Sequence, residues 1–118
     1  MKILITGSTG FIGTNLVSFL KNNNSIEILE ASRENGFDLS HDGWTKNLPK
    51  NEIDIVIHLA QSSLYRNFPE GATDVRKVNI DSTAEILEWA RMNKIKKFIF
   101  ASTGSVYDNS KGEKKESD

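Results

Sequence analysis

The chain of 118 residues contains no cysteine, which excludes disulfide bridges, thiolate metal sites and cysteine nucleophiles. It also lacks an excess of charge of either sign, because 15 Lys and Arg residues are balanced by 16 Asp and Glu residues. This balance gives no general attraction for nucleic acid or for an anionic membrane surface. No run of about 18 apolar residues is present, so we expect no membrane-spanning helix and a cytoplasmic protein.

What the chain does contain is the composition of an ordinary globular domain. Hydrophobic residues make up 37% of the sequence and charged residues 26%, which is enough apolar material to form a core. We expect one domain over residues 1–107. Residues 108–118 follow as a polar segment that we expect to be disordered.

The hydrophobic pattern predicts strands alternating with helices. Short apolar runs predict strands at 2–6, 26–31, 53–60 and 96–101, and a very short one at 37–39. Apolar residues at helical spacing predict helices over 11–22 and 74–93, with a helical turn within 41–48. Such alternation implies right-handed crossovers. We therefore predict an α/β fold, a doubly wound, Rossmann-like parallel sheet with strand order 3-2-1-4-5.

A glycine-rich turn separates the first predicted strand from the first predicted helix. Residues 6–13 read TGSTGFIG, with glycines at positions 7, 10 and 13. One glycine in such a turn permits backbone angles that a Cβ forbids, a second lets a pyrophosphate approach, and a third lets helix and strand pack closely. The free amides at the positive end of the helix then face the phosphates. The simpler alternative is a turn that is merely tight.

The pattern TGxxGxxG resembles that of the short-chain dehydrogenase/reductase superfamily, and its FIG ending resembles the extended branch, the NAD-dependent epimerase/dehydratase family. Further segments resemble this family in the same order: Asp38-Leu39, His58-Leu59-Ala60, the NVxGT-like residues 79–83 and the SSxxVYG-like residues 102–107. The resemblance covers residues 1–108. It implies cofactor contacts from Gly7, Thr9, Gly10, Phe11, Ile12, Gly13, Asp38, Leu39, Leu59, Ala60 and Asn79.

Two of these segments also allow plainer interpretations. His58 has no second histidine or carboxylate at ligand spacing, so we interpret it as a core or cofactor-lining histidine and expect no metal site. Asn79 lies within a predicted amphipathic helix, where an amide that packs or anchors a loop is an equal alternative.

The end of the second predicted strand bears on the choice between NAD and NADP. In this fold an acidic residue there pairs with the ribose of NAD, while a nearby arginine accommodates the extra phosphate of NADP. The chain has Ser32 and Arg33 at this point, with Glu30 two residues earlier. Because serine removes the repulsion and Arg33 can bond to the phosphate, the sequence favours NADP. The alternative is that Arg33 is an exposed loop residue.

The resemblance also implies a catalytic hydroxyl, a tyrosine and a lysine. The hydroxyl corresponds to Thr103, unless this residue only caps a strand. Tyr107 and Lys111 match YxxxK by spacing, but the tyrosine of VYG is not the catalytic one in the family. The family's Tyr-Lys helix therefore has no counterpart here, and neither has the substrate lobe that binds a nucleotide sugar.

These observations leave three hypotheses. The first is the truncated, NAD(P)-binding portion of a nucleotide-sugar epimerase, dehydratase or reductase, which binds its cofactor weakly and does not turn over. The second is a non-catalytic nucleotide-binding or interaction module on a Rossmann half-fold. The third is a small complete reductase that uses Tyr107 and Lys111. We also expect exposed apolar surface at the last strand and the long helix, through which the chain forms a homodimer.

Overall fold

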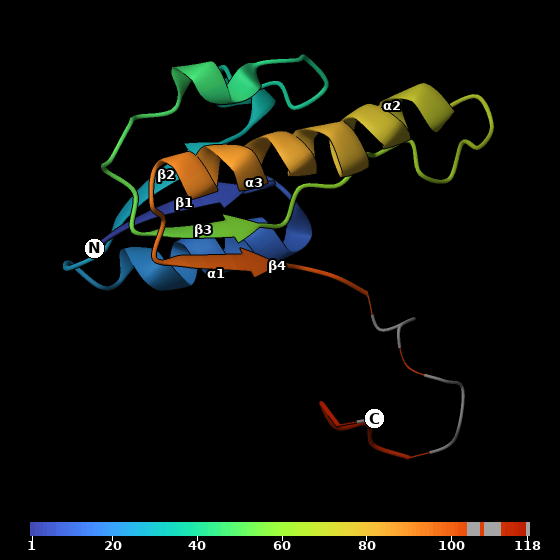
Figure 1. Cartoon of the computed structure of the whole chain (residues 1–118). Helices are drawn as coiled ribbons and strands as arrows, with labels where there is room; N and C mark the ends of the chain where they lie inside the picture. Colours follow the sequence, from blue (N-terminus) through green and yellow to red (C-terminus); the bar gives the residue numbers. More distant parts are fainter. Residues whose placement is uncertain (104–106, 108–111, 118) are drawn as a thin grey trace.

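Four parallel strands form the centre of the structure, a computed structural model that describes residues 1–103, 107 and 112–117. The strands lie in the order β2-β1-β3-β4 (Figure 1). Their bounds are Lys2–Thr6 for β1, Glu27–Ala31 for β2, Ile55–His58 for β3 and Lys97–Phe100 for β4. Thr6 pairs with Ala31 and His58, and His58 pairs with Phe100, so the carboxyl ends of all four strands meet at one edge.

Helical segments cover both faces of this sheet. They are α1 (Phe11–Lys21), α2 (Ala72–Arg76) and α3 (Ser82–Met92), with short 3₁₀ turns η1 (Arg33–Asn35) and η2 (Trp44–Asn47). Helix α1 lies on one face, and α3 lies on the other (Figure 1). The α/β fold with a parallel sheet is therefore confirmed.

The long helix predicted over residues 74–93 is interrupted by a π-helical turn. This turn, η3 (Lys77–Asp81), joins α2 to α3 and contains Asn79. π-Helical turns are rare and frequently occur at functional sites. The sequence pattern predicted the amphipathic face but not this local change of backbone geometry.

The prediction of a strand at residues 37–39 is wrong, because these residues form no strand. The other four strands lie in the predicted order. The Phe37 amide instead bonds back to the Ser32 carbonyl at 2.9 Å, which closes a turn. The Asp38 carboxylate accepts bonds from the Ser40 amide and hydroxyl at 3.0 and 2.7 Å. Such local side-chain bonds stabilise a turn and compete with strand pairing.

The core is divided into two clusters by the sheet. The larger one lies between the sheet and α3, and its buried residues are Leu4, Ala31, Leu39, Trp44, Leu48, Ile53, Val56, Val78, Ile86, Trp89 and Ala90. The smaller one lies under α1 and contains Ile3, Ile5 and Val17. Adjacent residues of β1 point to opposite faces, as expected for a strand buried on both sides.

The polar C-terminal segment contributes no helix or strand within its described residues, 112–117. Residues 108–111 and 118 of the segment predicted to be disordered lie outside the described part of the chain. Over the described ranges, no helix combines the length and apolar character that crossing a bilayer requires.

Candidate functional site

A cavity of about 1000 Å³ opens at the carboxyl ends of the strands. Its walls come from the segments at the end of each strand: residues 7, 9–13, 31–34, 59–61 and 100–103, together with Val78, Asn79 and Thr83 of the helical segment. Open parallel sheets bind ligands at this edge. The volume lies at the upper end of the range for ligand pockets, about 300 to 1000 Å³.

The three glycines of the turn after β1 meet different constraints. Gly7 has a φ of +69°, and a Cβ there would lie 2.8 Å from the Ala60 nitrogen. A Cβ on Gly13 would lie 2.2 Å from the Gly7 carbonyl oxygen. A Cβ on Gly10 would meet only that oxygen, at 3.3 Å. The backbone therefore requires glycine at 7 and 13, whereas a side chain at 10 would enter the space that the turn leaves open.

The first turn of α1 offers backbone amides to this space. Its N-cap is Gly10, which has no side chain to cap the helix, and its first turn contains no acidic residue. The first bond of the helix runs from the Thr14 amide to the Gly10 carbonyl at 2.9 Å, so the amides of residues 11–13 precede it. Residues 11–13 line the cavity. Amides of this kind at a positive helix end are suited to an anion.

The end of β2 contributes a hydroxyl and a guanidinium to the cavity. Ser32 is buried and lines the cavity, and its Oγ has no hydrogen-bond partner among the described residues. Arg33 is exposed and also lines the cavity. The Glu30 carboxylate is paired with Lys21 at 2.9 Å and lies outside the lining. An acceptor for the ribose of NAD is therefore not supplied by Glu30.

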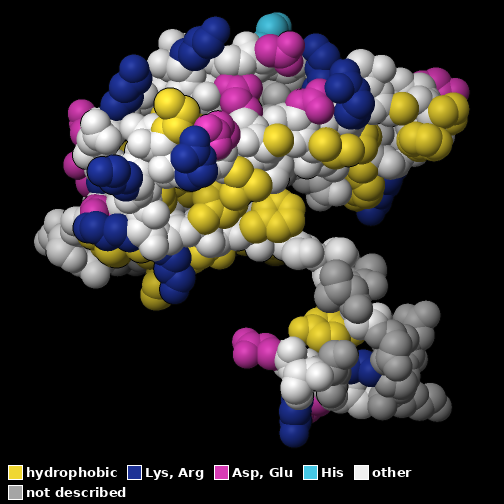
Figure 2. All heavy atoms as spheres, viewed as in Figure 1, with side chains coloured by type: hydrophobic (Ala, Val, Ile, Leu, Met, Phe, Trp, Pro, Cys, Tyr) yellow, Lys and Arg dark blue, Asp and Glu magenta, His cyan; other side chains and the backbone are white. Residues whose placement is uncertain are grey.

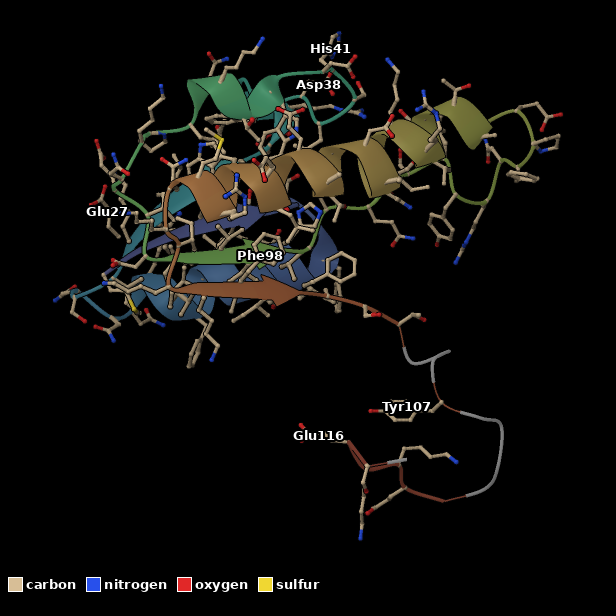
Figure 3. All side chains as sticks on the ribbon, viewed as in Figure 1. Glu27, Asp38, His41, Phe98, Tyr107 and Glu116 are labelled. Atoms are coloured by element: carbon tan, nitrogen blue, oxygen red, sulfur yellow. The ribbon has the colours of Figure 1, made fainter. Side chains whose placement is uncertain are left out.

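Asp38 is the member of the predicted site that does not line the cavity. Its carboxylate faces Arg33 at 3.5 Å and His41 at 3.1 Å, and Figure 3 shows Asp38 and His41 side by side. Hydrogen bonds from the Ser40 amide and hydroxyl, aided by the charge of Arg33, hold the pKa of Asp38 below its usual value. The carboxylate for which the resemblance implies a cofactor contact thus bonds to other groups of the protein.

His58 lies fully buried at the end of β3 and forms hydrogen bonds at both ring nitrogens. Its Nδ1 is 2.6 Å from the Thr6 hydroxyl, and its Nε2 is 2.9 Å from the Thr83 hydroxyl. Its ring stacks on Phe100, with centroids 5.8 Å apart. Burial lowers the pKa of His58 to about 4. The imidazole is therefore neutral near pH 7, and both of its ring nitrogens are occupied by bonds to hydroxyl groups.

Asn79 anchors the loop that follows β3 and lines the cavity as well. Its Oδ1 accepts a bond from the Ser62 amide at 2.8 Å. The Ser62 hydroxyl donates to the Asp74 carboxylate and accepts from the Leu64 amide at 3.1 Å. These bonds fasten the loop to α2 and η3, so the predicted loop-anchoring role of the amide is present together with exposure to the cavity.

All predicted site residues except Asp38 line this single cavity, namely Gly7, Thr9, Gly10, Phe11, Ile12, Gly13, Ser32, Arg33, Leu39, Leu59, Ala60, Asn79 and Thr103. The lining also includes residues that the motifs did not single out, among them Glu34, Phe37, Gln61, Ser63 and Phe100. Most of these follow the end of a strand, and this position is the signal that points to them. Tyr107 is not in the lining, and Lys111 lies outside the described residues.

Comparisons with known proteins agree with this geometry. The profile of the NAD dependent epimerase/dehydratase family matches residues 3–118. A dTDP-D-glucose 4,6-dehydratase from Dictyostelium discoideum is 34% identical over 90% of the chain, and a UDP-N-acetyl-alpha-D-glucosaminuronate decarboxylase from Bacillus cytotoxicus is 33% identical over 90%. The chain spans 30% and 37% of the lengths of these two relatives.

Solved structures give the same result. A UDP-glucuronic acid 4-epimerase from Bacillus cereus, in complex with NAD and a fluorinated UDP-glucuronic acid, matches with a TM-score of 0.78 and 27% identity. The match covers 98% of this chain and 44% of that one. The RMD protein from Pseudomonas aeruginosa, complexed with NADPH, shares the fold with a TM-score of 0.73 at 22% identity, over 94% of this chain and 38% of its own. This chain therefore belongs to the NAD-dependent epimerase/dehydratase family.

Proposed function

We propose that this chain is the NAD(P)-binding portion of an enzyme that acts on a nucleotide-linked sugar. One observation carries the proposal: the uncapped amides of α1 and the open side of Gly10 face a cavity that is large enough for a dinucleotide. The residues present fit such a group, because the buried Ser32 hydroxyl also lacks a protein partner among the described residues. Relatives that act on nucleotide sugars support the substrate class.

Within this function we propose that NADP is preferred to NAD. Arg33 can form a charge-assisted bond to the additional phosphate of NADP, and Ser32 adds no repulsion. Asp38 contributes indirectly, because its carboxylate holds Arg33 at 3.5 Å. Arg33→Ala is expected to weaken NADPH binding more than NADH binding, as measured by calorimetric titration. Equal losses for the two cofactors would contradict the preference.

We propose that the chain by itself binds cofactor weakly and does not turn over. A bound nicotinamide would supply hydride chemistry, and Thr103 places a hydroxyl on the cavity wall where a substrate hydroxyl or carbonyl would be oriented. Tyr107, which matches the first position of YxxxK by spacing, does not line the cavity. Steady hydride transfer that is lost in Tyr107→Phe would contradict this proposal and favour the small-reductase hypothesis.

The phosphate turn gives the sharpest test of cofactor binding. Gly10→Val should abolish NAD(P)H binding without unfolding the protein, because the added side chain fills the phosphate space rather than the core. Ser18→Val, which adds the same side chain on the exposed face of α1, is the matched control. Binding by Gly10→Val at the affinity of the unmodified protein would refute the assignment of the turn.

The exposed apolar surface favours an interaction role in addition. Leu87 on α3 and Ile99 and Phe100 on β4 are exposed, and Figure 2 shows hydrophobic side chains gathered along this side of the molecule. Among the described strands, β4 pairs with β3 alone and so leaves one edge open. We propose that the isolated chain forms a homodimer there. Sedimentation velocity tests this, and a monomer at 100-fold different concentrations would contradict it.

A further inference from the structure

A chain of buried hydrogen bonds crosses the base of the cavity between β1 and α3. We infer that His58 is a positioning residue of the cofactor cavity, because its imidazole fixes the wall formed by the glycine turn against the wall formed by η3 and α3. The inference rests on the proposed function, since it concerns the affinity of the same cavity for NAD(P)H. It does not require His58 to touch the cofactor.

The bonds on the α3 side determine which ring nitrogen carries the proton. The Thr83 hydroxyl donates to the Asn79 carbonyl at 2.9 Å, because a carbonyl oxygen can only accept. A hydroxyl has one proton, so Thr83 must accept from His58 Nε2, which lies 2.9 Å away. Nε2 of His58 is therefore protonated.

The hydrogen bonds on the β1 side complete this series. The Ala60 amide donates to the Thr6 hydroxyl oxygen at 3.3 Å, and that hydroxyl lies 2.6 Å from His58 Nδ1. If Nδ1 were protonated too, the Thr6 proton would have no acceptor among the described residues. With Nδ1 unprotonated, Thr6 donates to it. Both hydroxyls then accept one bond and donate one, which selects the neutral Nε2–H form of His58.

The two ends of this series of hydrogen bonds belong to opposite walls of the cavity. Thr6 directly precedes Gly7, and Ala60 closes against the position where a Gly7 Cβ would lie. At the other end, Thr83 and Asn79 line the cavity, and Asn79 belongs to the π-helical turn. His58 is the side chain that joins these walls through bonds at both ring nitrogens. Its position therefore determines the spacing that a bound dinucleotide meets.

The next residue of the sequence provides an internal comparison. The Ser82 hydroxyl also donates to a carbonyl of η3, that of Val78, at 2.6 Å. Ser82 is buried, lies outside the cavity lining and makes no bond to His58. Loss of this hydroxyl weakens the same turn without breaking the link between the two walls.

The test compares variants at these two positions by calorimetric titration with NADPH and NADH. Thr83→Val keeps the shape of the side chain and removes the hydroxyl, and it is expected to weaken binding about tenfold. Thr83→Ser restores the hydroxyl and should bind within about twofold of the unmodified protein. Ser82→Ala should lower the melting temperature and leave the affinity within about twofold. Unchanged affinity in Thr83→Val, or an equal loss in Ser82→Ala, would overturn the inference.

A spectroscopic measurement tests the bond directions directly. In ¹⁵N-labelled protein, the imidazole correlations of His58 should show a protonated Nε2 and an unprotonated Nδ1 at pH 7. A protonated Nδ1 would overturn the inference. If the unmodified protein binds neither cofactor, the proposed function fails instead, and the His58 spectrum still reports whether the hydrogen-bond chain exists.

Discussion

The two faces of the sheet are buried to very different degrees. The cluster beneath α3 contains eleven buried residues, while the cluster beneath α1 contains three, so most of the stabilising apolar burial lies on the α3 side. On the α1 side, Ile55 and Ile57 are only half-buried and Ile99 is 41% exposed. The comparison teaches that one face provides most of the buried apolar surface, whereas the other leaves apolar side chains partly exposed. Three predictions test it.

The largest expected effect is that of a core truncation on the α3 face. Ile86 on α3 is fully buried and belongs to the larger cluster, so Ile86→Ala should lower the free energy of unfolding by about 4 kcal/mol. Val17 on α1 belongs to the smaller cluster, and Val17→Ala should lower it by about 2 kcal/mol. Urea unfolding measures both values. A loss in Val17→Ala as large as that in Ile86→Ala would contradict the comparison.

The next prediction concerns the pH dependence that burial under α3 creates. Burial lowers the pKa of His58 from 6.5 to about 4, so between these values the unfolded chain binds a proton that the folded chain does not. Stability should therefore fall as the pH falls through this window, by about 3 kcal/mol in total.

Urea unfolding between pH 7 and pH 4 measures this dependence, and two histidine variants separate its source. The contribution should be absent in His58→Gln. It should persist in His41→Gln, because the His41 side chain is exposed. A pH profile of His58→Gln with the slope of the unmodified protein would assign the effect to other groups.

The smallest expected effect concerns the bonds that fasten the connection between β2 and β3 onto α3. The Glu85 carboxylate accepts bonds from the Gly43 amide at 2.9 Å and from the Thr45 amide and hydroxyl at 3.0 and 2.6 Å. Glu85→Gln should lower the free energy of unfolding by about 2 kcal/mol. Glu88→Gln is the control, because the exposed Glu88 pairs with Arg91 on the same helix. Equal effects of the two substitutions would show that this anchor has no special role.

Much of the site was predictable because its parts are local in the sequence. The glycine turn needs particular residue types at fixed spacing, and the structure shows a physical reason at Gly7 and Gly13. The apolar runs predicted the four strands that form, since strands buried on both faces must be apolar almost throughout. Because parallel strands carry their following segments to one edge, the residues at 32, 59 and 103 come together although they are distant in the chain.

The parts that sequence reasoning missed depend on which partner each group finds in three dimensions. Residues 37–39 have a strand-like pattern, yet the Asp38 carboxylate bonds to Ser40 and Arg33. Helical periodicity does not distinguish an α-helix from a π-helical turn, so the geometry around Asn79 was missed. Thr83 ends the NVxGT-like segment, but its place opposite His58 follows only from the packing of α3 on β3.

The sequence by itself determined the order of elements, the parallel sheet and the glycine turn, because each follows from residue types and spacings over a few positions. Tertiary structure alone decided that one face of the sheet is well buried and that the other is less so. It also decided the ionisation and tautomer of His58 and the pairing of Arg33 with Asp38. The reason is physical: burial, desolvation and hydrogen-bond direction are properties of groups that meet across long sequence separations, and no local pattern specifies them.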